Sequence, residues 1–401
     1  MKKSYIILQF LCVCFLFSCK KDEPAPSTNE PKVNPYKENG AAYILNQKEF
    51  PPNMTIYKLV PSGDGNFYFY GYKANYTVGK MSASGIIMWE YNPEYEIRTI
   101  AAYNNRLIVI GNRDFNNDNA FDLGYVSVID NGQKISQLEY DDYDNIQLND
   151  VAENKIVGRC LTGGFIYPIL LDFTLNDQIL SKNTIKYFQN MPYYRFGNID
   201  KGYIYTLNVD TKDFSADINA REYMIVKLDN NKNVEWTRTI PLFEQGYQMV
   251  FWDILVHNNT VYVAGSTEIK EEVEPSNGSK WTAATLVSIA STGELLYAKK
   301  YNPSKYDDGY NQLVAEGDII YAAGTYAHVI KGGTAYLGYG MLSKIVATTG
   351  NVLEDKYFGS DQYRSGYNTL TLYNARLYAA GYTQQKVYGQ YGGWFCELLK
   401  F

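Results

Sequence analysis

The chain has 401 residues, a formal net charge of −6 at pH 7 and 46% hydrophobic residues. A chain of this size and composition can bury a large core. The acidic balance argues against a nucleic-acid partner, because nucleic-acid-binding proteins normally present a face rich in Lys and Arg to the phosphates. Tyrosine is unusually frequent, with 39 residues against 18 Phe and 5 Trp. Its ring with a polar tip suits half-exposed sheet surfaces, or surfaces that contact sugars or proteins.

The first residues have the pattern of a targeting segment. Lys2 and Lys3 precede an apolar run over residues 5–17, which is too short to cross a membrane as a stable helix. The run ends in Leu16-Phe-Ser-Cys19, which resembles a bacterial lipobox. The resemblance implies a signal peptide over residues 1–18, cleavage before Cys19, and diacylglycerol and acyl (palmitate-type) chains on Cys19. Several chains on one residue anchor a protein stably in a membrane.

Residues 19–39 are rich in Pro, Lys, Glu, Asn and Ser, a composition that predicts a flexible, lipid-anchored tether. The run Lys20-Lys-Asp-Glu23 resembles the export signal of surface-exposed lipoproteins of the Bacteroidota. We therefore expect an outer-membrane lipoprotein exposed on the cell surface, with a periplasm-facing position as the alternative. The predicted membrane contact is made through Cys19.

From residue 40 to residue 401 short strand patterns and Gly/Asn/Asp turns alternate without a helical period. A glycine that ends a second strand recurs six times, at Gly71, Gly111, Gly158, Gly265, Gly324 and Gly381. A diverged copy over residues 203–207 has no glycine, which makes seven repeats of four strands. The spacings of 40 to 59 residues are typical of propeller blades.

The two ends of the repeat region complement each other. The chain ends in a third strand, residues 393–401, with no fourth strand after it. Residues 44–50 match the fourth strand at residues 352–358, with identical Leu, Lys and Phe positions. We therefore predict an all-β, seven-bladed β-propeller in which the N-terminal strand completes the last blade and removes its open edge.

Several turns carry a glycine followed four residues later by an aromatic residue, as in Gly85 to Trp89 and Gly293 to Tyr297, with a Lys232 to Trp236 variant. With this loose motif the chain resembles seven-bladed propellers of the quinoprotein-like type over about residues 41–401. The resemblance implies the fold and not the quinone cofactor, since the mature chain lacks the vicinal cysteine pair that such a site would use. No cofactor is expected.

Metal chemistry and catalysis receive little support. The only histidines, His257 and His328, have no Cys or His at ligand spacing, so no metal site is predicted. Residues 114–122 begin like a calcium loop but lack its Gly and Glu. Acid pairs at residues 141–142 and 307–308 lie in loops and are expected to be solvated. The remaining cysteines, Cys160 and Cys396, are expected to be buried free thiols, with a disulfide as the alternative.

A tyrosine next to an amide recurs where the first strand of a blade begins. The residues are Tyr247, Gln248, Tyr310, Asn311, Tyr367 and Asn368, with Tyr143 at the equivalent corner of another blade. One interpretation is a ring at the propeller mouth that stacks on sugars and bonds their hydroxyl groups. The other interpretation is that these tyrosines pack between adjacent blades.

The sequence thus favours a non-catalytic, lipid-anchored envelope protein that binds glycans at a mouth lined by Tyr and Asn. A scaffold that holds envelope proteins together is the alternative. A glycan hydrolase or lyase is the third and least favoured reading.

Overall fold

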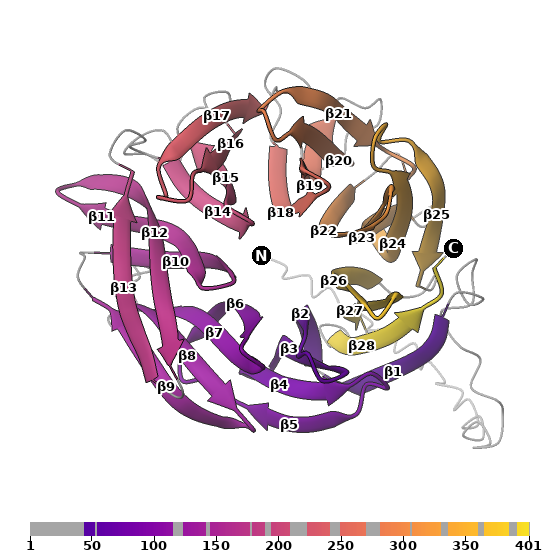
Figure 1. Cartoon of the computed structure of the whole chain (residues 1–401). Coiled ribbons are helices and arrows are strands. Elements are labelled where there is room, and N and C mark those ends of the chain that lie inside the picture. The colour runs from indigo at the N-terminus through magenta and orange to yellow at the C-terminus, as the bar shows by residue number, and fades with distance from the viewer. Residues whose placement is uncertain are drawn as a thin grey trace, which may run out of the picture. The chain divides into compact units, whose positions relative to one another are not determined.

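The computed structural model describes residues 44–52, 54–114, 123–141, 145–176, 179–188, 194–208, 223–240, 249–269, 281–304, 307–329, 336–359, 365–384 and 391–400. Within these ranges the chain forms seven antiparallel sheets of four strands each, arranged around a central axis (Figure 1). The predicted seven-bladed β-propeller is confirmed. No helix in the described residues is long and apolar enough to cross a membrane.

The blades follow one another in chain order, and each runs from its innermost to its outermost strand. Blades 1 to 4 contain β2 (Met54–Pro61), β3 (Asn66–Lys73), β4 (Tyr76–Ser82), β5 (Ile87–Tyr91); β6 (Glu96–Tyr103), β7 (Arg106–Arg113), β8 (Leu123–Asp130), β9 (Gln133–Tyr140); β10 (Asn145–Ala152), β11 (Lys155–Thr162), β12 (Phe165–Asn176), β13 (Ile179–Tyr187); β14 (Tyr194–Asp200), β15 (Tyr203–Asn208), β16 (Tyr223–Leu228) and β17 (Val234–Ile240). Blades 5 and 6 contain β18 (Met249–His257), β19 (Thr260–Ile269), β20 (Trp281–Ala290), β21 (Leu295–Tyr301); β22 (Asp308–Glu316), β23 (Ile319–Val329), β24 (Tyr336–Val346) and β25 (Val352–Phe358).

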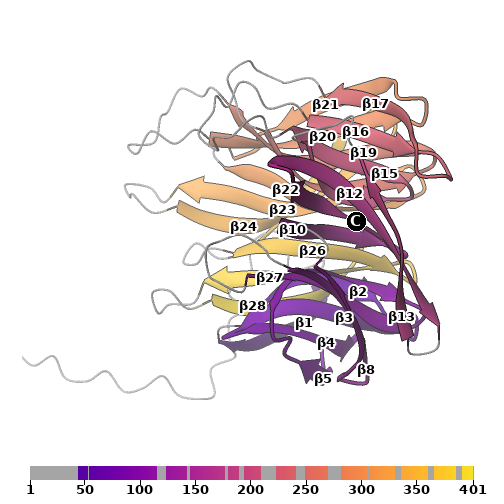
Figure 2. The same cartoon turned by 90° about the vertical axis from the view of Figure 1, so that its left-hand side faces the viewer.

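Blade 7 joins the two ends of the repeat region. It consists of β26 (Ser365–Tyr373), β27 (Arg376–Gln384), β28 (Tyr391–Leu398) and, at its outer edge, β1 (Ile44–Pro52). The strand β1 is antiparallel to β28, with Gln47 opposite Cys396, and Figure 2 shows the two strands side by side. Glu397 of β28 accepts hydrogen bonds from Asn46 of β1 (2.9 Å) and from Arg376 of β27 (2.5 Å). The predicted closure is confirmed.

The aromatic residue of the turn motif holds neighbouring blades together. Trp236 of β17 donates a 3.0 Å hydrogen bond to the carbonyl of Ser291 and covers Gly293 in the turn of the next blade. Tyr297 of β21 repeats the contact one blade further, with a 3.0 Å bond to the carbonyl of Ala347. Any side chain at Gly293 would meet the Trp236 ring, at 3.2 Å from its Cβ. The motif is therefore a contact between blades.

The repeated glycine of the second strand is required by a close backbone approach. At Gly324 of β23 a Cβ would lie 1.8 Å from the carbonyl oxygen of Gly309, and at Gly381 of β27 it would lie 1.9 Å from that of Gly366. Real Cβ atoms do not approach an oxygen so closely, so only glycine fits. The approach occurs where the innermost strand of the same blade bends.

Cys160 and Cys396 are both free and buried, as predicted. Burial raises the pKa of the Cys160 thiol to about 12, and it raises that of Cys396 as well. Both thiols therefore stay protonated at neutral pH and act as small apolar side chains of the blade cores.

Candidate functional site

Each innermost strand contains a β-bulge at the same place. In β22, Tyr310 pairs with Gly324 and Gln312 pairs with Ala323, so that Asn311 is the additional residue. The other six innermost strands have the same shift in register. A bulge places two residues opposite one residue of the partner strand and redirects their side chains. Here it turns two consecutive side chains toward the channel.

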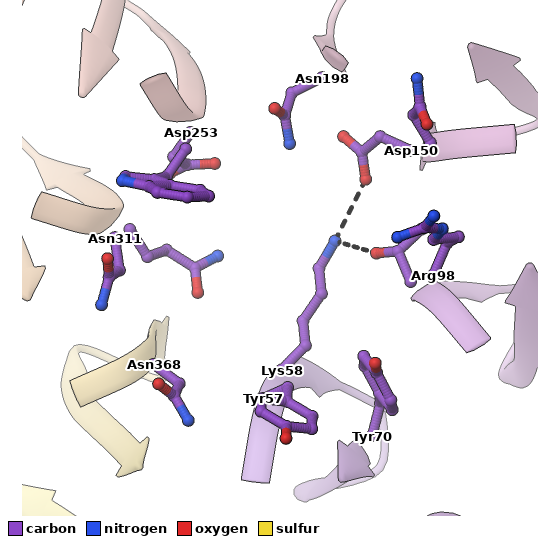
Figure 3. A pocket seen from close by; sticks show the side chains of 13 residues that line it. Tyr57, Lys58, Tyr70, Arg98, Asp150, Asn198, Asp253, Asn311 and Asn368 are labelled. Carbon is purple, nitrogen blue, oxygen red and sulfur yellow. Dashed lines mark hydrogen bonds and ion pairs between the residues drawn. The ribbon is translucent and has the colours of Figure 1, made fainter. Parts of the chain in front are cut away.

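The bulges build two rows of residues around the axis. The first row, in blade order, contains Tyr57, Arg98, Asn149, Gly197, Trp252, Asn311 and Asn368. The second row contains the residues that follow them, Lys58, Thr99, Asp150, Asn198, Asp253, Gln312 and Thr369. Twelve of these fourteen residues, together with Tyr70, line a cavity of about 470 Å³ (Figure 3). We take this cavity as the candidate functional site.

The first row includes two exposed aromatic side chains. Trp252 of β18 is 52% exposed and Tyr57 of β2 is 41% exposed, although both lie in the wall of the channel. Tyr57 packs against Tyr70 with ring centroids 5.3 Å apart. Blade 1 lies across a seven-bladed ring from blades 4 and 5, so Tyr57 and Trp252 stand on opposite sides of the channel. Gly197, the first-row residue of blade 4, contributes no side chain.

The second row connects a blade to the next at four of its seven positions. There the side chain accepts a hydrogen bond from the backbone N–H that follows the bulge in the neighbouring blade. The pairs are Asp150 with Ile199 (3.2 Å), Asp253 with Leu313 (2.8 Å), Gln312 with Leu370 (3.2 Å) and Thr369 with Leu59 (3.0 Å). Carboxylate, amide and hydroxyl oxygens thus perform the same task at equivalent positions.

Lys58, a member of the second row, contacts the second-row residues of the next two blades. Its ammonium group donates to the Thr99 hydroxyl at 2.7 Å and lies 3.4 Å from a carboxylate oxygen of Asp150, as Figure 3 shows. Lys58 is 27% exposed, while Asp150 is buried. The pair therefore forms a partly desolvated ion pair from blade 1 to blade 3, which ties three blades together inside the channel.

Asp253 has an unusual environment. Burial raises the pKa of its carboxyl to about 7, and the nearby Asp150 and Asp200 carboxylates add to the effect. The bond from the Leu313 N–H and the charge of Lys58 act in the opposite direction. Near neutral pH Asp253 is therefore only partly ionised, so the cavity holds less negative charge than its composition indicates.

The structure separates the predicted tyrosines from their amide neighbours. Tyr310 and Tyr367 are fully buried, so a ligand in the channel cannot stack on their rings. Tyr310 donates to the Ser343 hydroxyl at 2.9 Å, and Tyr367 packs edge-on against Trp394 at 4.6 Å between ring centroids. For these two residues the second interpretation, in which the tyrosines pack between blades, describes the structure. The prediction that they face a ligand is corrected, because each tyrosine precedes the bulge and is buried in the blade, while the two residues after it turn toward the channel.

Asn311 and Asn368 line the cavity, and their binding of a ligand stays a prediction. The Asn311 amide donates to the carbonyl of Tyr367 at 2.7 Å, and the Asn368 amide donates to the carbonyl of Ile56 at 2.8 Å. Each therefore links its blade to the next, while its side chain remains partly exposed in the channel. Their amide hydrogens therefore have a structural task.

The remaining predicted site residues lie outside the described residues. These are Cys19, Tyr143, Tyr247 and Gln248. In blade 5 the residues equivalent to Tyr310 and Asn311 are Phe251 and Trp252, because Phe251 pairs with the repeated Gly265 as Tyr310 pairs with Gly324. Trp252, which the sequence analysis did not single out, therefore occupies the first row in this blade.

No group of three or more His, Cys, Asp or Glu side chains comes together as a metal site in the part of the chain described here. His257 contacts the carbonyl of Gly317 at 2.7 Å and thereby links blade 5 to blade 6. Just before β22, Asp307 accepts a bond from the Thr282 N–H. Asp308, the first residue of β22, is buried and accepts a bond from the Ser304 N–H, so the expectation of a solvated loop acid is wrong for this residue. These acids stabilise the entry to the blade, and the calcium-like loop lies almost entirely outside the described residues.

The arrangement of blades and channel defines the chain as a seven-bladed β-propeller. Neither a protein-family model nor a curated protein matches the sequence. Among solved structures, BamB from Moraxella catarrhalis is similar with 13% identity and a TM-score of 0.40, covering 84% of this chain and 85% of that chain. The Dos1 propeller has 9% identity and a TM-score of 0.47, covering 88% and 94%. A quinohemoprotein alcohol dehydrogenase from Pseudomonas putida HK5 has 10% identity and a TM-score of 0.46, covering 91% and 78%. At these identities we draw no functional argument from the likeness.

Proposed function

We propose that this protein is a non-catalytic, lipid-anchored envelope protein that binds a glycan in the channel cavity. The observation that carries the proposal is the exposure of Trp252 and Tyr57 on opposite sides of a cavity lined otherwise by polar side chains. Exposed aromatic rings in the wall of a concave, polar cavity offer flat apolar faces on which sugar rings can stack.

The polar lining supports the same ligand class. Asn149, Asn198, Asn311 and Asn368 surround the aromatic rings and present amide groups to the cavity. Amides donate and accept hydrogen bonds, as sugar hydroxyl groups do. A volume of about 470 Å³ is within the range of small-ligand pockets. The cavity therefore offers stacking, hydrogen bonding and space to one ligand.

The carboxylates of the cavity favour binding over hydrolysis. Asp150 and Asp253 both hold a backbone N–H of the next blade, and Gln312 and Thr369 do the same at equivalent positions. A glycosidase needs two carboxyl groups that are available to the sugar as acid and as base or nucleophile. The task that Asp150 and Asp253 share with an amide and a hydroxyl is a structural one.

A glycan array with the purified protein tests the proposal. We expect binding to at least one oligosaccharide class, and Trp252→Ala should abolish it by removing the larger stacking surface. Leu353→Ser, an exposed position on the outer strand β25, serves as the matched control and should leave binding unchanged. Binding that survives Trp252→Ala, or the absence of any glycan ligand, would contradict the proposal.

The scaffold alternative is supported by a different surface. The second residue of the outermost strand is a large, exposed apolar side chain in four consecutive blades, namely Leu296, Leu353, Leu45 and Met88 in blades 5, 6, 7 and 1. A protein partner at this rim would be lost on Leu353→Ser and retained on Trp252→Ala. Affinity capture with the two variants therefore distinguishes the two functions.

The membrane anchor is proposed from the lipobox-like sequence at Cys19 and places the propeller at the outer membrane. Cys19→Ser should release the protein from the membrane fraction, because no acyl chain can then be attached. Protease treatment of intact cells distinguishes surface exposure from the periplasm-facing alternative. Mass spectrometry of the N-terminal peptide measures the modification directly, and an unmodified peptide from the native protein would contradict the anchor.

A further inference from the structure

The outermost strand of six blades has a β-bulge at its start. In β25, Val352 pairs with Ile345 and Glu354 pairs with Lys344, so that Leu353 is the additional residue. The additional residues of the other five strands are Leu45, Met88, Ile135, Glu235 and Leu296. A bulge redirects the side chain of its additional residue. Four of the six residues are apolar and between 47% and 56% exposed, namely Leu45, Met88, Leu296 and Leu353.

The bulge itself does not require an apolar residue. In blade 4 the equivalent residue is Glu235, which accepts a 3.0 Å hydrogen bond from Lys227. In blade 2 it is Ile135, which is partly buried against the core of its blade. Among the six bulges, the residue is both apolar and exposed in blades 5, 6, 7 and 1, which follow one another around the ring. Packing within the blade therefore does not explain these four side chains.

Two further exposed apolar residues lie at the same edge. The turn before β5 rests on blade 7, where a Cβ at Gly85 would lie 2.8 Å from the Lys48 side chain of β1. That turn carries Ile86, which is exposed. Leu399 is also exposed and follows β28 at the end of blade 7 where β1 begins. We call the six residues the apolar arc, which comprises Leu296, Leu353, Leu45, Leu399, Ile86 and Met88.

The apolar arc and the cavity belong to opposite ends of the blades. In blade 6 the innermost strand β22 begins where β23 ends, and its cavity residue Asn311 follows soon after. The outermost strand β25 begins where β23 begins, because Ile345 pairs with both Val352 of β25 and Ile320 of β23. Leu353 therefore lies at the end of the blade opposite to the start of β22. A surface that covers the apolar arc leaves the cavity end of the propeller accessible.

The course of the chain indicates what covers the apolar arc. The first strand of the propeller begins at Ile44, directly before Leu45. Residues 20–43 connect this point with Cys19, the proposed lipid site, and span at most about 80 Å at full extension. The membrane that holds the acyl chains is therefore within reach of the arc, and such a link raises its effective concentration there. Apolar side chains gain free energy when they leave water for the acyl region of a membrane.

We propose that the apolar arc rests on the membrane leaflet that holds the acyl chains of Cys19, so that the cavity end of the propeller points away from the lipid. The inference rests on the proposed anchor and adds a second, non-covalent membrane contact to it. The scaffold alternative assigns part of the same surface to a protein partner. The position of the link favours lipid, because the link brings a membrane to the arc and no particular protein.

Fluorescence quenching in vesicles tests this contact. The full-length protein is purified with its lipid and reconstituted into vesicles of phosphatidylethanolamine and phosphatidylglycerol, with or without nitroxide-labelled lipid. A thiol-reactive, polarity-sensitive fluorophore is attached to Leu353→Cys or to Met88→Cys. The label reaches the new thiol alone, because Cys160 and Cys396 are buried and acylation blocks Cys19.

We expect a blue shift of the emission at both positions, and a loss of fluorescence when the vesicles contain nitroxide-labelled lipid. Ser181→Cys is a control on the outermost strand β13 of blade 3, across the ring from blades 6 and 7. Lys73→Cys is a control at the opposite end of blade 1 from Met88. Both control labels should show the emission of a fluorophore in water and no quenching.

Removal of apolar side chains from the arc provides a second test. Leu45→Ser and Leu296→Ser together, in the protein labelled at Met88→Cys, should reduce the quenching of that label. The protein should stay on the vesicles through its acyl chains. Both positions are exposed, so thermal unfolding should be unchanged, which checks that the fold is intact.

The outcomes separate the arc from the anchor. If the protein joins the vesicles while the labels at Leu353→Cys and Met88→Cys remain in water, the arc contact is refuted and the anchor stands. Equal quenching of the control labels refutes the proposed orientation. Labels that are shielded from water but not quenched show that a second copy of the chain covers the arc, which overturns the assignment to lipid. A protein that carries no acyl chains and does not join the vesicles refutes the anchor itself.

Discussion

The two rows of the channel are made by neighbouring residues of the same seven strands, and they have different tasks. Residues of the second row differ in type. Four of them nevertheless accept a hydrogen bond from the equivalent backbone N–H of the next blade, namely Asp150, Asp253, Gln312 and Thr369. Residues of the first row also differ, but here the difference sets what faces the cavity, from Trp252 to Gly197. The contrast shows that a repeat fixes a position while only the surroundings decide whether its side chain supports the fold or meets a ligand.

The largest expected effect comes from a steric clash beside the bulged innermost strand of blade 6. Gly324→Ala would place a Cβ 1.8 Å from the Gly309 oxygen and push the two strands of blade 6 apart. We expect a loss of more than about 3 kcal/mol in the free energy of unfolding, measured by urea titration. Gly317→Asn, at a turn with positive φ and nothing within 4 Å, is the control and should cost less than about 1 kcal/mol. Similar losses for both variants would refute the steric explanation.

The second row is tested by Asp150→Ala. This change leaves the Lys58 ammonium without its ion-pair partner and the buried Ile199 N–H without an acceptor. We expect a loss of about 2–3 kcal/mol, less than for a fully buried pair because Lys58 is partly exposed. Asp150→Asn retains an oxygen for the Ile199 N–H and should recover part of the loss. If both variants unfold like the wild-type protein, the row does not hold the blades together.

Asp253 of the second row should make the stability of the protein depend on pH. Its pKa in the folded protein is about 7, above the ordinary value of 3.8, so between these pH values the folded state holds more protons than the unfolded state. Stability contributed by the neutral carboxyl is therefore present at low pH and is lost as the pH rises toward 7. Asp253→Asn removes the charge and should be more stable than the wild-type protein at pH 8, by about 1–3 kcal/mol. Thermal unfolding at pH 8 and pH 4.5 measures this, and an equal difference at both pH values would contradict it.

The smallest effect on stability is expected in the first row. Trp252→Ala should change the free energy of unfolding by less than about 0.5 kcal/mol, since the ring is exposed and packs little. The same variant should lose glycan binding. Parallel measurement of both quantities is decisive, because a large loss of stability would make Trp252 a packing residue like Tyr310.

The architecture could be predicted from the sequence because the backbone of each blade requires a glycine at the same position, and the spacing of these glycines gives the length of the repeat. The six glycines mark places where a carbonyl leaves no room for Cβ, and the match of residues 44–50 with β25 predicted the partner of β28. Blade 4, with Thr206 in place of the glycine, still has the bulge between Phe196 and Ile199. The strand repeat could therefore be recognised in blade 4 although its glycine is replaced.

The site was predicted only in part. The repeated Tyr-Asn pairs attracted attention because they recur, but recurrence at Tyr310 and Tyr367 reflects packing between blades. The innermost strands can be aligned on the repeated glycine of the strand that follows. Each then shows an apolar residue, two variable residues and a second apolar residue. This alignment would have put Trp252 at the position of Asn311. Which variable residue meets the channel depends on the bulge, which has no sequence signature as direct as that of a turn.

The strand that closes the ring has a consequence for how the protein is made. The partner of β1 is β28, and more than 300 residues separate the two along the chain. A ribosome therefore releases the first strand of the domain long before its partner exists. Blade 7 can be completed only when the final strand has emerged, so a chain that stops before β28 has no strand to join β1 to β27.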